Sequence, residues 1–252
     1  MHARYAILSH TWLQKKPEVV YEDAKNPQKW HSIQSGRRSA YRKLEGFCKI
    51  ARDKHGVSFA WMDTICINKD STSELEESIR SMYRWYKNSY VCIVYLSHTT
   101  SLADMHLDRW FTRGWTLQEL LAPSKLKFYN KTWKDLTALL NEKASPPSPN
   151  IKSDQMDILQ IIHKATGIEP KQLLSFEPGV DQGIASRMIW AAKRSTTRGE
   201  DRAYSLMGVF NVSFSIAYGE GTDRAFFRLL EAILSSFNNP LDILNWAGTP
   251  CS

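Results

Sequence analysis

The chain has 252 residues, which is enough for one large domain or two small ones. Its 42% hydrophobic and 23% charged residues are the usual composition of a water-soluble globular protein with a substantial core. The longest apolar run, Tyr90–Leu96, has seven residues, whereas a membrane-spanning helix needs about 20. The composition therefore argues against a membrane-embedded protein.

The net charge of +7 is spread along the chain and not concentrated in one segment. Only Arg37, Arg38, Arg42 and Lys43 cluster, and on a helix they would form an ordinary solvated face. We therefore do not expect nucleic-acid binding to be the main role, whereas a small phosphorylated ligand would need only a few basic side chains. The four cysteines lack CxxC or zinc-type spacing and no secretion signal opens the chain, so we expect a cytoplasmic protein.

The first half of the chain alternates short apolar runs with helical patterns. Because strands that alternate with helices usually form a parallel sheet, we expect an α/β fold with helices on both faces. The expected strands are Tyr5–Leu8, Val57–Met62, Tyr90–Leu96 and Lys125–Tyr129. The expected helices are Ser39–Lys54, ended by Gly56, a second helix after the polar turn Asn68–Ser73, and a third that holds Glu119 in its first turn.

Residues 13 to 34 show little periodicity and are expected to be an insertion, with a possible short element around Val19–Tyr21. The SPPSP segment, residues 145 to 149, is expected to be a linker or sharp connection. We therefore divide the chain into an α/β core, residues 1–144, and a mainly helical part, residues 145–252, packed on it. The helices expected there are Met156–Ala165, Ile184–Lys193, Glu200–Met207 and Asp223–Phe237.

Polar residues follow three successive strands of the predicted sheet. Ser9 and His10 follow the first strand, Asp63 the second, and Ser97 with His98 the third. In an open parallel sheet, ligands bind outside the carboxyl ends of the strands, where the strand order reverses. Each of these residues alone is equally typical of a turn or helix cap, but their recurrence favours a site.

The stretch Asp108–Leu121, DRWFTRGWTLQELL, mixes large apolar side chains with arginines and one glutamate. Such a mixture is unusual for a plain core helix and is typical of a segment that lines a site. The simpler alternative is that Thr116 and Glu119 form a capping box, since Thr-x-x-Glu is the sequence signature of that motif. The tryptophans, likewise, are commonly core residues.

Three blocks of this sequence resemble the hallmark motifs of the fungal HET (heterokaryon incompatibility) domain. They are YAILSHTW (Tyr5 to Trp12), WMDTICIN (Trp61 to Asn68) with the following SELEESIRSMYRWY, and WFTRGWTLQELLAP (Trp110 to Pro123). The later segments TTRGEDRAYSLMGVF and AYGEGTDRAFFRLLEAI resemble the carboxyl-terminal part of that family. The resemblance implies a domain that triggers programmed cell death in non-self recognition, a form of innate immunity. It also implies self-association, and partners such as an NLR-type nucleotide-binding oligomerisation module or other HET proteins.

A more distant resemblance is to TIR domains, which have a flavodoxin-like parallel sheet. The order GVSFAWMD, a helix that begins with glutamates, YVCIVYLS and WTLQEL is similar to the TIR plan. In that family a Trp-Cys-x-x-Glu-Leu motif carries the glutamate needed to cleave NAD, and Trp115 to Leu120 reproduces it with Thr116 in place of Cys. The resemblance therefore implies that Glu119 is catalytic and that NAD, or a related nucleotide, is a substrate and not a resident cofactor.

The expected substrate-binding residues lie around this glutamate and at the strand ends. They are Ser9, His10, Thr11, Trp12, Asp63, Arg109, Arg113 and Trp115. Arg113 or Arg109 would hold a diphosphate, and a tryptophan would stack on a ring. We find no Ser/His/Asp order, glycine-rich phosphate loop or metal-ligand spacing, so no metal is expected. The alternative to an enzyme is a non-catalytic domain that kills by oligomerising and recruiting other proteins.

Overall fold

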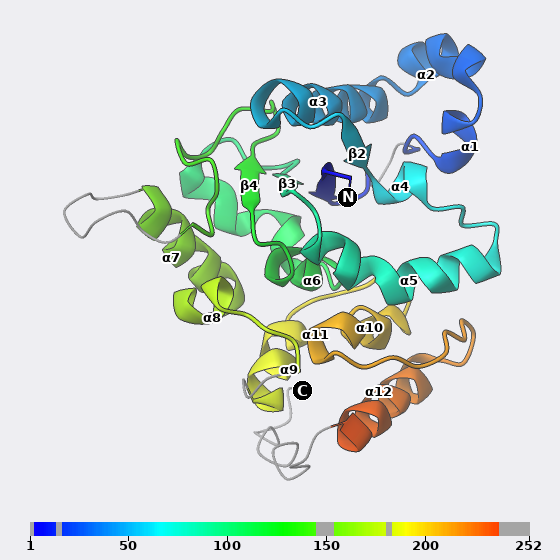
Figure 1. Ribbon diagram of the computed structural model, residues 1–252, viewed down its shortest axis with the longest axis vertical. Helices are drawn as coiled ribbons and strands as arrows, with labels where there is room; N and C mark the ends of the chain where they lie inside the picture. Colours follow the sequence, from blue (N-terminus) through cyan, green and yellow to red (C-terminus); the bar gives the residue numbers. More distant parts are fainter. Residues whose placement is uncertain (1–2, 14–16, 145–153, 180–182, 237–252) are drawn as a thin grey trace.

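The computed structural model describes residues 3–13, 17–144, 154–179 and 183–236, and the predicted 145–149 linker lies outside this part of the chain. Four parallel strands form one sheet in the order β2-β1-β3-β4. Their bounds are β1 Tyr5–His10, β2 Phe59–Trp61, β3 Val91–Tyr95 and β4 Leu126–Tyr129. The predicted α/β fold with helices on both faces of a parallel sheet is confirmed (Figure 1).

Two helices connect the first three strands and cover opposite faces of the sheet. They are α3 Arg38–His55 and α5 Thr72–Lys87. Helix α3 ends at Gly56, whose φ of 61° is the left-handed conformation that glycine adopts without strain. Helix α5 begins after Ser71, whose hydroxyl accepts a hydrogen bond from the Glu74 amide. The end of α3 at Gly56 is as predicted, and α5 begins at Thr72, within the predicted polar turn.

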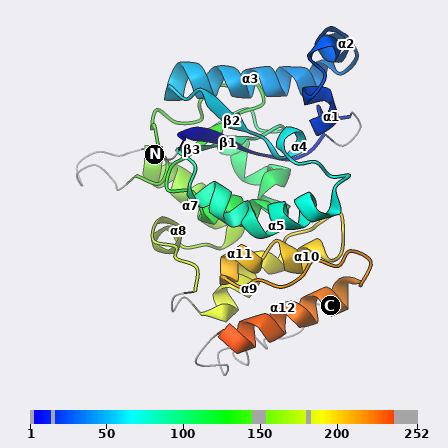
Figure 2. The ribbon, with the colours of Figure 1, turned by 45° about the vertical axis from the view of Figure 1, so that its right-hand side comes forward.

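Strands β1, β3 and β4 are buried on both faces, with side chains that alternate between two cores, whereas the edge strand β2 is largely exposed. Ala6 and Leu8 pack with Phe47 under α3, whereas Ile7 and Cys92 belong to the larger core on the α5 side. That larger core continues through helix α6 Thr116–Leu121 into the second half of the chain. Figures 1 and 2 show the resulting layers: α3, the sheet, α5 with α6, then α10 with α11, and α12 outermost.

Residues 17 to 37 contain short helices that the weak periodicity did not resolve. They are α1 Tyr21–Ala24, the 3₁₀ turn η1 Pro27–Lys29 and α2 Trp30–Gly36, with Val19 buried beside them. A further short helix, α4 Asp63–Cys66, directly follows β2. Two 3₁₀ turns, η2 Leu102–Leu107 and η3 Arg109–Thr112, connect β3 to α6.

The second half is helical, as predicted. Its helices are α7 Asp154–Thr166, α8 Pro170–Leu174, α9 Ile184–Ala192, α10 Asp201–Tyr204, α11 Met207–Phe210 and α12 Thr222–Ser236. The single helix expected over Glu200–Met207 is therefore wrong, because the chain breaks into α10 and α11. Gly208 lets α11 pack closely on α5, since a Cβ there would lie 2.2 Å from the Cβ of Tyr83.

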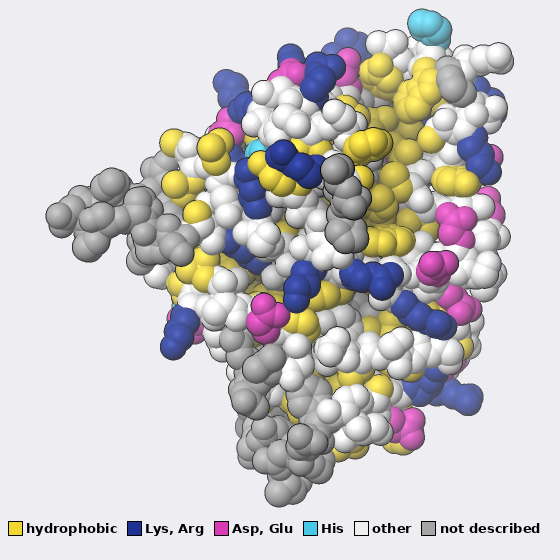
Figure 3. Space-filling view, viewed as in Figure 1, with side chains coloured by type: hydrophobic (Ala, Val, Ile, Leu, Met, Phe, Trp, Pro, Cys, Tyr) yellow, Lys and Arg dark blue, Asp and Glu magenta, His cyan; other side chains and the backbone are white. Residues whose placement is uncertain are grey.

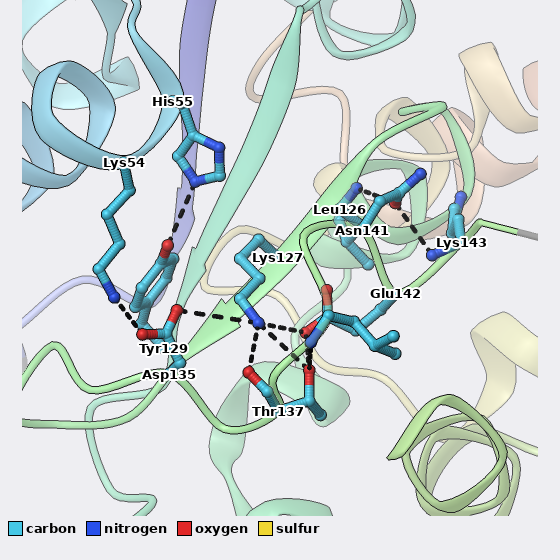
Figure 4. A network of polar contacts seen from close by, with 11 residues as sticks. Lys54, His55, Leu126, Lys127, Tyr129, Asp135, Thr137, Asn141, Glu142 and Lys143 are labelled. Carbon is cyan, nitrogen blue, oxygen red and sulfur yellow. Dashed lines mark hydrogen bonds and ion pairs between the residues drawn. The ribbon is translucent and has the colours of Figure 1, made fainter. Parts of the chain in front are cut away.

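The edge strand β4 is covered by the segment that follows it, residues 130 to 144. The buried ammonium of Lys127 donates hydrogen bonds to Thr137 and to Glu142 Oε1, the latter at 3.2 Å (Figure 4). Lys143 donates to the carbonyls of Leu121 and Pro123, which ties the same segment to the end of α6. The sheet edge is therefore closed by charged and polar contacts.

On the face shown in Figure 3, Lys and Arg side chains are scattered and interspersed with Asp and Glu. This distribution agrees with the even spread of basic residues along the sequence. Within the described ranges, each helix is too short or too polar to cross a lipid bilayer.

Candidate functional site

The strand order reverses between β1 and β3, because the chain passes from β1 to β2 on one side and then to β3 on the other. In sheets of this kind, a crevice forms outside the carboxyl ends of these two strands. A cavity of about 280 Å³ lies at this position, and His10 at the end of β1 lines it. The cavity also contains Glu119, Asp63, Trp12, Arg113 and Trp115, so the structure brings together most of the predicted site residues.

Glu119 is the most buried carboxylate of this cavity, with 8% of its surface exposed. The Ser9 hydroxyl donates a 2.5 Å hydrogen bond to Glu119 Oε2, and the Trp110 indole N–H donates to Ser9 Oγ at 2.7 Å. Neither Lys, Arg nor His forms an ion pair with Glu119 in the described part of the chain. Two neutral donors thus fix the carboxylate: Trp110 in η3 holds Ser9 in β1, and Ser9 holds Glu119.

The capping-box interpretation of Thr116 and Glu119 is wrong. The helix N-cap is Trp115, and its side chain makes no capping hydrogen bond. The Thr116 hydroxyl instead donates toward the Trp110 and Arg113 carbonyls, at 2.5 and 2.9 Å, and accepts from the buried Arg194 at 2.9 Å. Because Thr116 is engaged with the preceding turn, the Glu119 side chain is available to the cavity.

Burial raises the pKa of Glu119 to about 8, and the Asp63 charge acts in the same direction. Hydrogen bonds from Ser9 and Tyr86 and the positive charge of Arg113 oppose this rise without cancelling it. A carboxyl group in such an environment is largely neutral near pH 7 and ionises when a positive charge enters beside it. A strongly shifted group in a cavity is a common feature of functional sites.

A second chain of polar contacts fixes Asp63 at the rim. Asp63 accepts hydrogen bonds from His10 Nε2 and from the Trp12 indole, both at 2.8 Å. The Lys43 ammonium, bound to Glu18 at 2.5 Å, lies 2.9 Å from His10 Nδ1. Since an ammonium can only donate, His10 Nδ1 is the acceptor and Nε2 carries the proton given to Asp63.

Asp63 is held in its ionised form by these contacts. Burial would raise its pKa, but the contacts with His10 and Trp12 and the charge of Lys69 outweigh burial and hold the pKa below its ordinary value. Asp63 and Glu119 therefore differ: Asp63 is charged at the rim, and Glu119 is largely neutral at greater depth.

The second half of the chain supplies one wall of the cavity, which the sequence did not reveal. Thr197, Arg198, Asp201 and Tyr218 line it. Tyr218 donates to Asp201 at 2.8 Å, and the Arg198 guanidinium lies 4.1 Å from the centre of the Tyr218 ring. The TTRGEDRAY and AYGEG segments that carry these residues were noted only for their resemblance. Their position opposite Glu119 depends on long-range packing that no local pattern encodes.

Helix α5 provides an apolar wall from Leu75, Ile79 and Met82. Three predicted binding residues, Ser9, Thr11 and Arg109, do not line the cavity, although Ser9 is hydrogen-bonded to Glu119, which does. Thr11 is buried and pairs with Ser97 Oγ at 3.4 Å, and Arg109 lies close enough to Arg113 for its charge to lower the Arg113 pKa. No cluster of three or more His, Cys, Asp or Glu side chains suited to a metal ion occurs among the described residues.

Comparison with known proteins relates the chain to one family. Residues 5–109 match the model of the heterokaryon incompatibility protein (HET) family. Vegetative incompatibility protein HET-E-1 of Podospora anserina is 39% identical over 240 residues, covering 91% of this chain. The chain belongs to the HET family.

The HET chain spans only 16% of the length of that relative. The family match includes Ser9, His10 and Asp63 and ends before Glu119, whereas the relative is similar over nearly the whole chain, including the second half. No solved structure matches the HET chain. The family resemblance drawn from the three sequence blocks is therefore confirmed, and the resemblance to TIR domains remains a prediction.

Proposed function

We propose that this HET domain is a cell-death effector of heterokaryon incompatibility that cleaves the N-glycosidic bond of NAD or a related nucleotide and releases nicotinamide. Membership of the HET family and similarity to a vegetative incompatibility protein support the biological role. The chemical role is supported by one observation above all: Glu119 is a buried carboxyl group in a cavity at the strand ends and has no ion-pair partner among the described residues.

Cleavage of the glycosidic bond of NAD requires one carboxylate and few other protein groups. In NAD the nicotinamide is already a cation, so when the bond to the ribose breaks, the electron pair neutralises the leaving ring. No proton has to be supplied to the leaving group, unlike in the paired-carboxylate glycosidases. Positive charge develops on the anomeric carbon, and water adds there with loss of a proton. An ionised Glu119 against the ribose would stabilise that charge and orient the sugar.

The raised pKa of Glu119 is compatible with this role. With only protein groups around it, the carboxyl is largely protonated near pH 7. Entry of the cationic nicotinamide ring favours the ionised form, because an opposite charge within a few ångströms lowers the pKa of an acid. The substrate itself thus converts Glu119 into the charged group that the reaction requires.

The remaining residues of the cavity have roles that suit a nucleotide. Trp12 and Trp115 offer aromatic faces on which a ring can stack. Asp63 presents a fixed carboxylate to ribose hydroxyls, and Arg113, with Arg109 nearby, offers charge to a phosphate. We infer that activity in the cell requires self-association or assembly by an NLR-type oligomerisation module.

The alternative is a non-catalytic domain that kills by recruiting partners. Exposed apolar side chains on α9 and α12 favour it, since Ile189 and Phe227 are each 61% exposed. Such residues are frequent at protein interfaces. In that case the cavity would be a binding or structural feature.

Nicotinamide release from NAD by purified protein, both free and artificially clustered, tests the proposal. We expect turnover that disappears in Glu119→Gln while the fold, followed by circular dichroism, is retained. Glu76→Gln is the matched control, because Glu76 lies on the solvent side of α5 in an ion pair with Arg80. If clustered protein leaves NAD intact and Glu119→Gln still kills cells, the recruitment role is correct.

A further inference from the structure

Three cations line the cavity without a carboxylate partner in the described part of the chain. They are Lys69, Arg113 and Arg198, and none of them lies within 4.0 Å of an Asp or Glu oxygen there. Among the buried cations outside the cavity, Lys43 is paired with Glu18 and Lys127 with Glu142, whereas Lys143 is bonded to carbonyl oxygens. The cavity thus holds three cations that lack direct ion pairs with the described residues, and Asp63 and Asp201 act on them only at longer range.

The contacts that hold these cations position them but do not neutralise them. The Lys69 ammonium lies 3.5 Å from the centre of the Trp12 ring, and the Arg198 guanidinium lies over Tyr218. Arg113 donates to the Thr197 hydroxyl at 3.2 Å. An aromatic face attracts a cation through its quadrupole, and a hydroxyl is a neutral acceptor, so each positive charge remains available to a ligand.

The three cations come from separate parts of the chain and meet only at the cavity. Lys69 lies in the loop between α4 and α5, Arg113 follows η3, and Arg198 precedes α10. Burial and the nearby charge of Arg109 lower the pKa of Arg113, although Asp201 and Glu119 partly offset them. An anion bound between these side chains would relieve that repulsion.

We propose that Lys69, Arg113 and Arg198 together bind the diphosphate group of a dinucleotide, so that both halves of the chain recognise the substrate. The inference takes its ligand class from the proposed function. A diphosphate spreads its charge over several oxygens and can accept paired hydrogen bonds from arginine as well as the point charge of a lysine. Cations on separate elements suit such an extended anion better than a single phosphate.

Binding of ADP-ribose and of adenosine, measured by isothermal titration calorimetry, tests this inference without any turnover. We expect Arg198→Met to weaken ADP-ribose binding about tenfold, because a charged hydrogen-bond donor to the diphosphate is lost. Adenosine, which lacks phosphate, should bind both proteins equally. Lys69→Met should act in the same direction, and the wild-type affinity for ADP-ribose should fall with salt.

Arg202→Met is the matched control, because Arg202 lies on α10 but does not line this cavity. Arg198→Lys, which keeps the charge, should retain more ADP-ribose affinity than Arg198→Met, and this comparison separates charge from folding. Equal binding of ADP-ribose to wild type and Arg198→Met would overturn the inference, as would an absence of ADP-ribose binding by a protein that cleaves NAD. Charge-dependent ADP-ribose binding without NAD cleavage would leave this inference standing and refute the proposed function.

Discussion

One glutamate is buried beside strand β4 and another beyond the end of strand β1. Comparing them shows that burial alone does not make a glutamate part of a functional site. Glu142, beside β4, is fully buried and accepts hydrogen bonds from Lys127 and Thr137 (Figure 4). Glu119, beyond β1, is bonded by Ser9 and faces a cavity without an ion-pair partner in the described chain. Burial raises the pKa of both groups. Only Glu119 has room beside it for a ligand, so the pairing of Glu142 is structural.

The largest expected effect is on catalysis. Glu119→Gln should reduce nicotinamide release at least about 100-fold, the usual loss when one electrostatic stabiliser is removed. Glu142→Gln should leave the rate per folded molecule unchanged. Turnover measured on both variants, with the folded fraction determined by circular dichroism, decides whether the comparison is correct. Equal losses in the two variants would contradict it.

The next effect is on stability, where we expect the substitution of Glu142 to be more damaging than that of Glu119. Glu142→Gln should lower the free energy of unfolding by about 3 kcal/mol, because it leaves the buried charge of Lys127 without its principal partner. Glu119→Gln should cost less, since it removes no ion pair. Urea unfolding of both variants at pH 7 measures the difference. A larger loss in Glu119→Gln would mean that Glu119 is primarily a structural group.

The dependence of stability on pH gives a further test of whether Glu119 is buried as an uncharged group. The pKa of Glu119 is about 8 in the folded protein and near 4.5 when exposed, so the unfolded chain releases this proton first as the pH rises. Its contribution to stability is therefore complete below pH 4.5 and is lost as the pH rises through 8. Relative to Glu119→Gln, wild type should lose about 2 kcal/mol between pH 5 and pH 6.5, since one pKa unit corresponds to about 1.4 kcal/mol. Urea unfolding at several pH values measures this difference, and a gap independent of pH would show that Glu119 ionises normally.

The smallest expected effect concerns the hydrogen bond that positions Glu119. Ser9→Ala removes the donor to Glu119 Oε2 and leaves the Trp110 indole N–H without its acceptor. Nicotinamide release should fall roughly tenfold, the effect of losing about 1.5 kcal/mol in the transition state. The midpoint of the rate against pH should also shift upward, because Ser9 favours the ionised form of Glu119. An unchanged pH profile would show that Ser9 is only a packing residue.

The sequence predicted the sheet well because its strands are continuous apolar runs and its helices have clear caps. Gly56 marks a helix end directly, and the polar residues His10 and Asp63 line the cavity where the winding of a parallel sheet places them. Local patterns could not separate a capping role from a site role for Glu119, because the decision rests on where Thr116 directs its hydroxyl.

The rest of the site depends on contacts between residues far apart in the sequence. Tyr218 and Arg198 reach the cavity because α11 packs on α5 through Gly208, a contact without any periodic signature. The chain from Glu18 through Lys43 to His10 is equally remote from local sequence patterns. Buried polar networks of this kind are fixed by the tertiary structure, so single-sequence reasoning finds their members only by chance.

The residues that line the cavity range from His10 to Tyr218 in the sequence. During synthesis the chain emerges from its amino end, and Tyr218 is among the last residues of the site to leave the ribosome. An unfinished or truncated copy therefore has strand tips and Glu119 but no complete enclosure around them. Under the proposed cell-death role, a fragment that ends before Arg198 would lack one wall of the cavity, and we expect it to be inactive.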